Sequence, residues 1–150
     1  MVQGDPDFPD IHSCLGFAYH RASRNEEAVS EFRRAVELSP GNPGFVAELA
    51  RVLGRAGKRQ EAEHLLADLE DLSKKVYVSN VALAYVYESV GRRDEAFERL
   101  ELAYEEREGG LAGIRRNLEM NELRKDPRWT SIEGRMGFPP DPSNRGRIPL

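Results

Sequence analysis

The pattern of apolar positions in this chain returns every 34 residues. Leu15, Leu49 and Leu83 are spaced by this interval. The same interval relates three further sets of positions, namely Gly16, Ala50 and Ala84, then Tyr19, Leu53 and Tyr87, and then Ala28, Ala62 and Ala96. Self-similarity with a period of this length indicates an array of repeats, in which one small structural motif is stacked several times.

Within each repeat, the apolar residues predict two helices joined by a short turn. In the first repeat, Leu15, Gly16 and Tyr19 fall on one stripe of a helix with 3.6 residues per turn. A second stripe, with spacings of four and seven, follows at Ala28, Phe32 and Ala35. Between the two helices lie polar turn residues, at Ser23, Gly57 and Gly91 in the three repeats. The sequence therefore predicts an all-α fold built from pairs of helices.

This 34-residue pattern resembles the tetratricopeptide repeat (TPR). The resemblance is carried by Leu15, Gly16 and Tyr19 in the first helix and by Ala28, Phe32, Ala35 and Pro40 after it. It implies three helix-turn-helix repeats, at residues 9–42, 43–76 and 77–110, stacked into a short right-handed α-solenoid. Residues 1–8 are then an N-terminal extension. Because Lys74 and Glu108 stand where the family places a closing proline, we expect looser second and third boundaries, with a longer or continuous helix.

A helical cap is expected after the third repeat, in residues 111–138, because the last repeat of a stack leaves one face without a neighbour. Leu111, Ile114 and Leu118 predict one helix that docks on the third repeat. Asp126 followed by Pro127 predicts the start of another, which ends at Gly137. Residues 139–150 are rich in proline, glycine and charge, and we expect a flexible tail there. The C-terminal part also resembles the TPR tails of multidomain bacterial signalling proteins.

Composition and charge narrow the choice of partners. The chain of 150 residues has a formal net charge of −4, whereas a dedicated nucleic-acid-binding protein usually has a strong basic excess. No apolar run approaches the roughly 20 residues that a membrane-spanning helix needs. A single cysteine, Cys14, cannot form an internal disulfide. We therefore expect a cytoplasmic protein that binds neither nucleic acid nor membranes.

The sequence offers little support for catalysis. His12 and His20 are eight residues apart, whereas a helical metal pair needs a spacing of four. Cys14 and His12 are separated by two positions and so point to different helix faces. No phosphate-binding glycine-rich loop is present. We expect no enzyme activity, no cofactor and no metal site.

Protein binding is the function that the TPR resemblance implies. In that family, the first helix of each repeat lines a concave groove, and the groove-facing positions carry basic and aromatic side chains here. Arginine beside aromatic residues is a common composition of interaction hot spots. The predicted partner-binding residues are Phe17, His20, Arg21, Arg51, Arg55, Tyr85 and Glu88. We therefore expect a non-catalytic adaptor or scaffold that binds a peptide segment of acidic character.

Two further interpretations follow from the sequence. Chaperone-binding TPRs hold a C-terminal carboxylate with lysine and asparagine side chains, but none of the matching residues fits: Ser13, Phe17, Glu48, Val78 and Ala82. The first helix, with Ile11, Leu15, Phe17 and Tyr19, is expected to expose apolar surface, which usually marks an interface. The alternatives to a peptide adaptor are thus self-association through this helix, or a role as the tail of a larger signalling protein.

Overall fold

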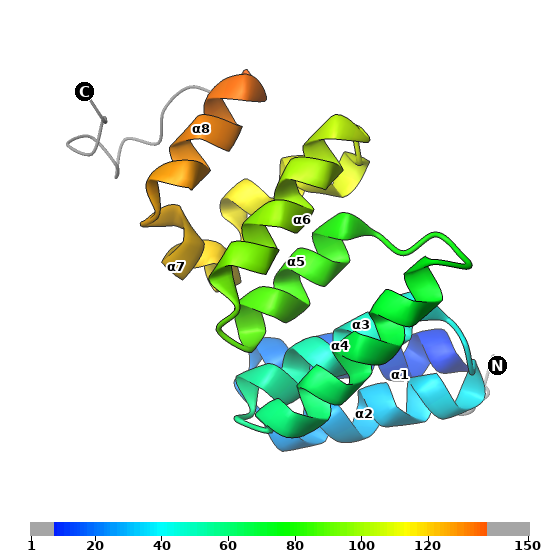
Figure 1. Cartoon of the computed structure of the whole chain (residues 1–150). Coiled ribbons are helices and arrows are strands. Elements are labelled where there is room, and N and C mark those ends of the chain that lie inside the picture. The colour runs from blue at the N-terminus through cyan, green and yellow to red at the C-terminus, as the bar shows by residue number, and fades with distance from the viewer. Residues whose placement is uncertain (1–7, 138–150) are drawn as a thin grey trace, which may run out of the picture. The chain divides into compact units, whose positions relative to one another are not determined.

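The computed structural model describes residues 8–137, and every secondary-structure element in that range is helical (Figure 1). The all-α fold class is therefore confirmed. The chain divides into two compact units, Met1–Val78 and Ser79–Leu150, here called the N-terminal and the C-terminal unit. The N-terminal extension and the flexible tail that the sequence predicts lie outside the described residues, apart from Phe8 in the former.

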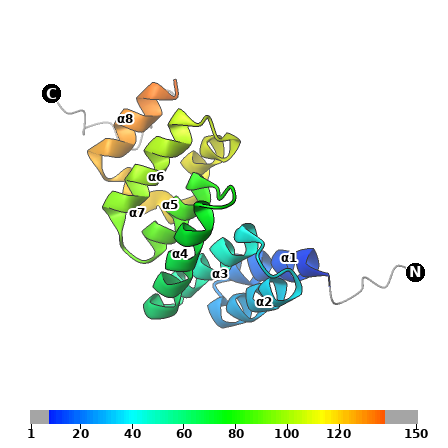
Figure 2. The ribbon, with the colours of Figure 1, turned by 45° about the vertical axis from the view of Figure 1, so that its right-hand side comes forward.

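The N-terminal unit consists of successive packed helices (Figure 2). These are α1 (Pro9–Arg21), α2 (Asn25–Leu38), α3 (Pro43–Arg55) and α4 (Arg59–Ser73). Each helix packs against the next one along the chain. Proline occupies the first turn of α1 and α3, where its missing N–H is not needed, and the Asn42 side chain accepts a hydrogen bond of 3.0 Å from the Gly44 N–H.

The C-terminal unit contains one further long helix pair and a set of shorter helices. Its elements are α5 (Asn80–Ser89), α6 (Arg93–Glu105), η1 (Gly109–Arg116), η2 (Leu118–Met120), α7 (Asn121–Arg124) and α8 (Pro127–Arg135). Helix α5 packs on α6, and α8 packs on both α6 and α7. The pairing of α5 with α6 repeats that of α1 with α2 and of α3 with α4.

The paired helices turn in the same way in each repeat. Ser23, Gly57 and Gly91 all have positive φ, at 59°, 80° and 79°. A residue with positive φ directly after a helix reverses the chain, and glycine adopts this conformation without a steric penalty. The polar residues that the sequence placed between the helices are therefore the residues that end the first helix of each pair.

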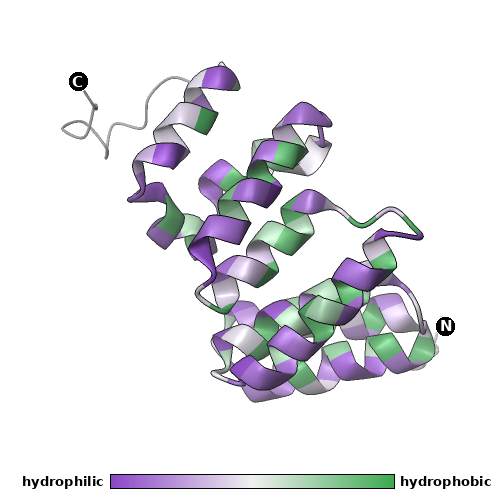
Figure 3. Cartoon of the chain, in the orientation of Figure 1, coloured by the Kyte–Doolittle hydropathy of each residue, from purple (hydrophilic) through white to green (hydrophobic). Residues whose placement is uncertain are grey.

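The core follows the stripes that the periodicity predicts. In the N-terminal unit, Ala28, Phe32 and Ala35 are fully buried, and Gly16 is buried against them. In the C-terminal unit, Leu83 and Leu100 are fully buried, and Trp129 is 2% exposed. The sides of α4 and α6 that face the viewer in Figure 3 are largely hydrophilic, as amphipathic helices require.

The expectation of a continuous helix at the second repeat boundary is wrong. Helix α4 ends at Ser73, and α5 begins only at Asn80, so no continuous helix joins them. At the start of α5, the Glu108 carboxylate accepts hydrogen bonds from the backbone N–H groups of Asn80 at 2.8 Å and Val81 at 3.1 Å. A carboxylate at a helix N-terminus satisfies unpaired N–H groups and interacts favourably with the helix dipole. Glu108, near the end of the third repeat, thus caps the start of α5.

The predicted docking helix at residues 111–118 also needs correction. Residues Gly109–Arg116 form a 3₁₀ helix, and Leu111 and Ile114 are buried as expected, but Leu118 is 77% exposed. By contrast, α8 starts as predicted: the Asp126 side chain accepts a hydrogen bond of 2.9 Å from the Arg128 N–H, and Pro127 occupies the first turn. The sequence pattern therefore predicts α8 correctly, but it does not indicate that Gly109–Arg116 forms a 3₁₀ helix.

Candidate functional site

The predicted binding residues of the N-terminal unit lie on α1 and α3. Phe17 and Arg21 are four residues apart on α1, and Arg51 and Arg55 are four apart on α3. Side chains with this spacing are neighbours on a helix surface. Each helix therefore contributes one short stripe to the candidate site.

Phe17 links the two stripes. Its ring packs edge-on against Phe32 of α2, with centroids 5.2 Å apart and an angle of 89° between the planes. The Arg51 guanidinium lies over the Phe17 ring, 5.7 Å from its centroid. A cation within about 6 Å of an aromatic centroid is attracted by the ring quadrupole. The half-buried ring is thus held from both sides, and it joins α1 to α3.

Arg51 is more deeply placed than a groove-lining residue need be. The residue is 7% exposed, and its guanidinium forms an ion pair of 2.6 Å with Glu48, one turn earlier on α3. Part of its positive charge is therefore balanced within its own helix. Its contacts with Phe17 and Glu48 suit Arg51 to hold the aromatic ring in place.

The remaining predicted residues of the N-terminal unit are closer to solvent. Arg21 is exposed and Arg55 is half-buried, and each is the last residue of its helix. Cations at that position interact favourably with the helix dipole, which is a structural role in its own right. His20 is half-buried, with its Nδ1 3.4 Å from the Asn25 Oδ1.

Tyr85 and Glu88 belong to the C-terminal unit. Both are half-buried on α5, three residues apart. Glu88 lines a cavity of about 260 Å³ together with residues of α6 and α7, among them Arg93, Glu122 and Leu123. The structure therefore brings Phe17 and Arg51 into contact within one unit and places Tyr85 and Glu88 in the other.

A second cavity lies in the N-terminal unit, at a place that the sequence reasoning missed. It has a volume of about 340 Å³ and is lined by Arg33, Leu49, Leu53, Gln60, Glu61, His64 and Leu65. The ion pair between Arg33 and Glu61, at 2.6 Å, crosses between α2 and α4 at its wall. The periodicity predicts that the apolar positions of α3 and α4 belong to the core, and it carries no signal for a gap between the two helices.

The residues considered for catalysis do not converge. His12 pairs with Glu31 of α2, with an Nδ1 to Oε2 distance of 2.6 Å, and so joins α1 to α2. Cys14 is exposed, and His20 lies at the other end of α1. Within residues 8–137, no group of three or more histidine, cysteine, aspartate or glutamate side chains is placed to hold a metal ion.

Comparison with known proteins gave one match, which covers part of the chain. Residues 19–77 match the family model described as tetratricopeptide repeat. Neither the curated proteins nor the solved structures that were compared with the chain gave a match. None of the helices in the described part of the chain combines the length and apolar character needed to cross a bilayer. The family match over residues 19–77 and the succession of paired helices on either side of it both support a tetratricopeptide repeat protein.

Proposed function

We propose that this protein is a non-catalytic adaptor that binds a peptide segment of acidic character on the face formed by α1 and α3. Tetratricopeptide repeats are generally protein–protein interaction modules, and the family is typically non-catalytic. The observation that supports the proposal is the stacking of Arg51 on Phe17, which brings an arginine of α3 against an aromatic ring of α1.

Each residue has a distinct role in the proposal. The half-buried Phe17 ring is the apolar anchor, and Arg51 fixes its orientation. Arg21 and Arg55, at the ends of α1 and α3, supply positive charge to a carboxylate of the peptide. Tyr85 and Glu88 remain predicted groove residues from their positions in the third repeat, and the proposal does not depend on them.

The typical free energies of such contacts indicate that both the Phe17 ring and the arginine charges contribute to peptide binding. An exposed ion pair contributes about 0–1 kcal/mol, because solvent and salt screen it. Truncation of a well-packed aromatic anchor at an interface costs about 2 kcal/mol or more of binding free energy. We therefore expect Phe17 to set much of the affinity, and Arg21 and Arg55 to set the preference for acidic over basic peptides.

The first experiment selects peptides from a displayed random library on the immobilised full chain. The proposal predicts enrichment of aspartate and glutamate over the starting library. A selected peptide is then labelled and its dissociation constant measured by fluorescence anisotropy. Phe17→Ala, and Arg21→Glu combined with Arg55→Glu, should each weaken binding by roughly tenfold or more, which corresponds to about 1.4 kcal/mol.

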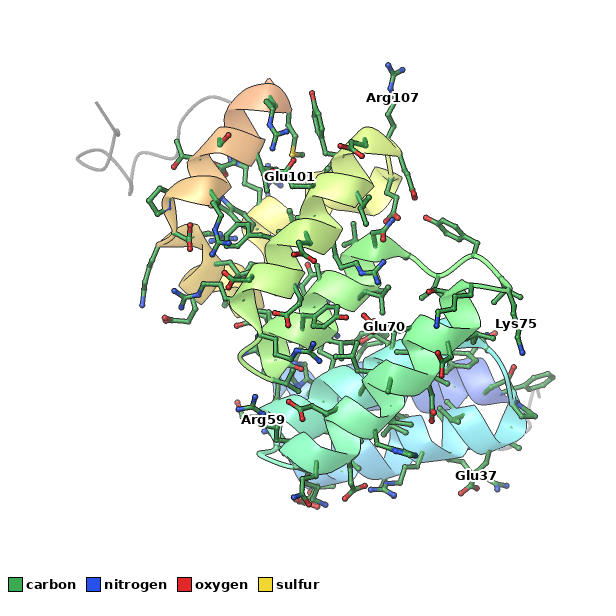
Figure 4. All side chains as sticks on the ribbon, viewed as in Figure 1. Glu37, Arg59, Glu70, Lys75, Glu101 and Arg107 are labelled. Carbon is green, nitrogen blue, oxygen red and sulfur yellow. The ribbon has the colours of Figure 1, made fainter. Side chains whose placement is uncertain are left out.

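The matched control is Arg59→Glu on α4, an exposed arginine that makes only a surface pair with Glu63 (Figure 4). It makes the same Arg→Glu exchange at one position instead of two, and it should leave the affinity within about twofold. Arg51 is not reversed, because a glutamate there would stand beside Glu48 in a buried position and unfold the site. Peptides without acidic enrichment, or equal affinity for the Arg21/Arg55 double variant, would overturn the proposal.

A further inference from the structure

One side of α1 is apolar and open to solvent. Phe8 is 57% exposed, Ile11 36% and Leu15 42%, and Ala18 is exposed as well. Phe8 directly precedes α1, and with spacings of three, four and three residues it continues the stripe that Ile11, Leu15 and Ala18 form on the helix, here called the outer stripe. Three large apolar side chains in a row on a single helix face are typical of an interface rather than of a solvated surface.

The equivalent face of α3 shows what such a stripe does in this fold. Leu49 and Val52 stand 34 residues after Leu15 and Ala18, and they are 6% and 0% exposed. Helix α3 packs against α2, and Leu49 shares a cavity wall with Arg33 of α2. On α3, this face is covered by a second helix. An α-helix is therefore the element that fits the outer stripe of α1.

Charges beside the outer stripe indicate which helix fits. On one flank, α1 packs against α2 and pairs His12 with Glu31. On the other flank lie Asp10 near the start of α1 and Arg21 at its end, both exposed. Residues 10 and 21 stand five positions before and six positions after Leu15. An antiparallel helix with the same sequence therefore sets an aspartate opposite each arginine.

We propose that the outer stripe of α1 docks on the outer stripe of a second copy of this chain, with the two helices antiparallel and related by a two-fold axis. Leu15 of each copy meets Leu15 of the other at the centre. Asp10 of each copy pairs with Arg21 of the other, as flanking charges do in antiparallel coiled coils. This contact uses the outer stripe instead of the Phe17 ring, and it shares only Arg21 with the proposed peptide site.

The contact area sets the expected strength. A helix of 13 residues is about 20 Å long. A single face of that length buries well below the roughly 800 Å² per partner of a stable interface. The dimer is therefore weak, and its population depends on protein concentration in the range from about ten micromolar to one millimolar.

Sedimentation equilibrium of the full chain over that concentration range tests the contact. The chain should show a reversible monomer–dimer equilibrium. Leu15→Glu places a charge at the centre of the interface and should weaken dimerisation at least tenfold. Leu118→Glu is the matched control, because Leu118 is also an exposed leucine but lies in the C-terminal unit. Circular dichroism confirms that both variants keep their helices.

Exchange of the flanking charges tests the geometry. Asp10→Arg and Arg21→Asp should each weaken self-association, because each sets like charges opposite one another in a pair of identical copies. Mixing the two single variants should restore association as a heterodimer, since every arginine then faces an aspartate. The double variant should also dimerise. Because Asp10→Arg leaves Phe17, Arg21 and Arg55 unchanged, its peptide affinity should stay normal, which separates this test from that of the proposed function.

Cys14 reports on the same contact, because it is exposed on the flank that carries Asp10 and Arg21. A short bismaleimide should link two wild-type copies in the concentration range where they dimerise, and Cys14→Ser removes the link. A monomer at all concentrations overturns the proposal. So does a dimer that Leu15→Glu and the charge exchanges leave intact, or one that Leu118→Glu weakens to the same extent.

Discussion

At the scale of single residues, the packing of α1 on α2 depends on the pairing of Gly16 with Phe32. A Cβ atom at Gly16 would lie 2.7 Å from the Phe32 Cε2, which is shorter than any normal contact. At the equivalent positions the chain has Ala50 with Leu66, and Ala84 with Leu100, all buried. The largest of the three side chains, Phe32, is thus paired with the smallest of the three partners, Gly16.

This pairing predicts a compensating double mutation. Gly16→Ala alone should lower the free energy of unfolding by about 1–3 kcal/mol, because the added methyl group overpacks the Phe32 ring. Gly16→Ala combined with Phe32→Leu reproduces the pairs of the other repeats, and it should be less destabilising than the two single changes added together. Urea denaturation followed by circular dichroism measures all three variants.

Gly134→Ala on α8 is the control, since nothing lies within 4 Å of its added Cβ. It should stabilise the protein by about 0.5–1 kcal/mol through helix propensity alone. Strict additivity in the Gly16/Phe32 cycle would show that the two residues do not compete for the same space.

The sequence predicted which residues share a helix face, but not all of their partners. The stripe Ala28, Phe32 and Ala35 is buried as its spacing indicates. By spacing alone, Arg51 and Arg55 are like charges that repel each other, yet Arg51 pairs with Glu48. Which of several neighbours a long side chain contacts depends on how the helices pack, and a periodic pattern holds no information on that.

At the scale of elements, α8 shows a helix start that the sequence specifies fully. Asp126 Oδ1 accepts hydrogen bonds from the Arg128 N–H and from the Arg128 Nε at 3.1 Å, and Oδ2 accepts one from Nη2 at 2.9 Å. The hydrogen bonds from the Arg128 side chain are the main cause that lowers the pKa of Asp126, with the backbone N–H adding to them. The cap is thus stronger when the carboxylate is ionised.

The lowered pKa of Asp126 predicts a pH dependence of stability. The folded state holds this proton less tightly than the unfolded chain, so the ionised cap stabilises the protein at pH values above about 3.9, the ordinary aspartate pKa. That contribution is lost as the pH falls through the lowered pKa of the folded state. Asp126→Asn keeps an accepting oxygen but has no charge to lose.

Thermal unfolding of the wild type and Asp126→Asn should therefore converge below pH 3.9, after the wild type has been the more stable at neutral pH. Asp126→Ala removes the cap altogether and should be less stable than both by about 1 kcal/mol where they converge. A constant difference between the wild type and Asp126→Asn from pH 7 to pH 2 would contradict this account.

The 3₁₀ segment Gly109–Arg116 shows where element prediction fails. Leu111 and Ile114 are three residues apart, a spacing that suits both an α-helix and a 3₁₀ helix, which has three residues per turn. Three glycines, at Gly109, Gly110 and Gly113, weaken the α-helical preference of this stretch. The buried pair was therefore predictable, whereas the helix type and the exposed Leu118 were not.

At the scale of the whole molecule, the 34-residue period predicted the succession of helix pairs, but it gave no sign of a division into two compact units after Val78. A repeat contacts mainly its neighbours, so stability is approximately a sum of local contributions. The 34-residue period reports only the features that all the repeats have in common. The division between units depends instead on how many contacts cross one particular boundary.

This organisation predicts that destabilisation remains local. Phe32→Ala removes a fully buried ring from the N-terminal unit, at a cost of about 3–5 kcal/mol. Hydrogen exchange should then accelerate strongly in α1–α4 and much less in α5 and α6. Leu100→Ala in the C-terminal unit should give the reverse pattern. Equal acceleration throughout the chain in both variants would show a single cooperative unit.

The turns within the helix pairs have a consequence for the way such a chain can vary. At Gly57 and Gly91, no atom lies within 4 Å of the position that a side chain would take, and Ser23 is exposed at the equivalent point. Extra residues inserted there would extend into solvent and leave both packed faces in place. Insertions of several residues can therefore accumulate at these points and obscure the 34-residue interval in a related sequence while its helices still pair in the same way.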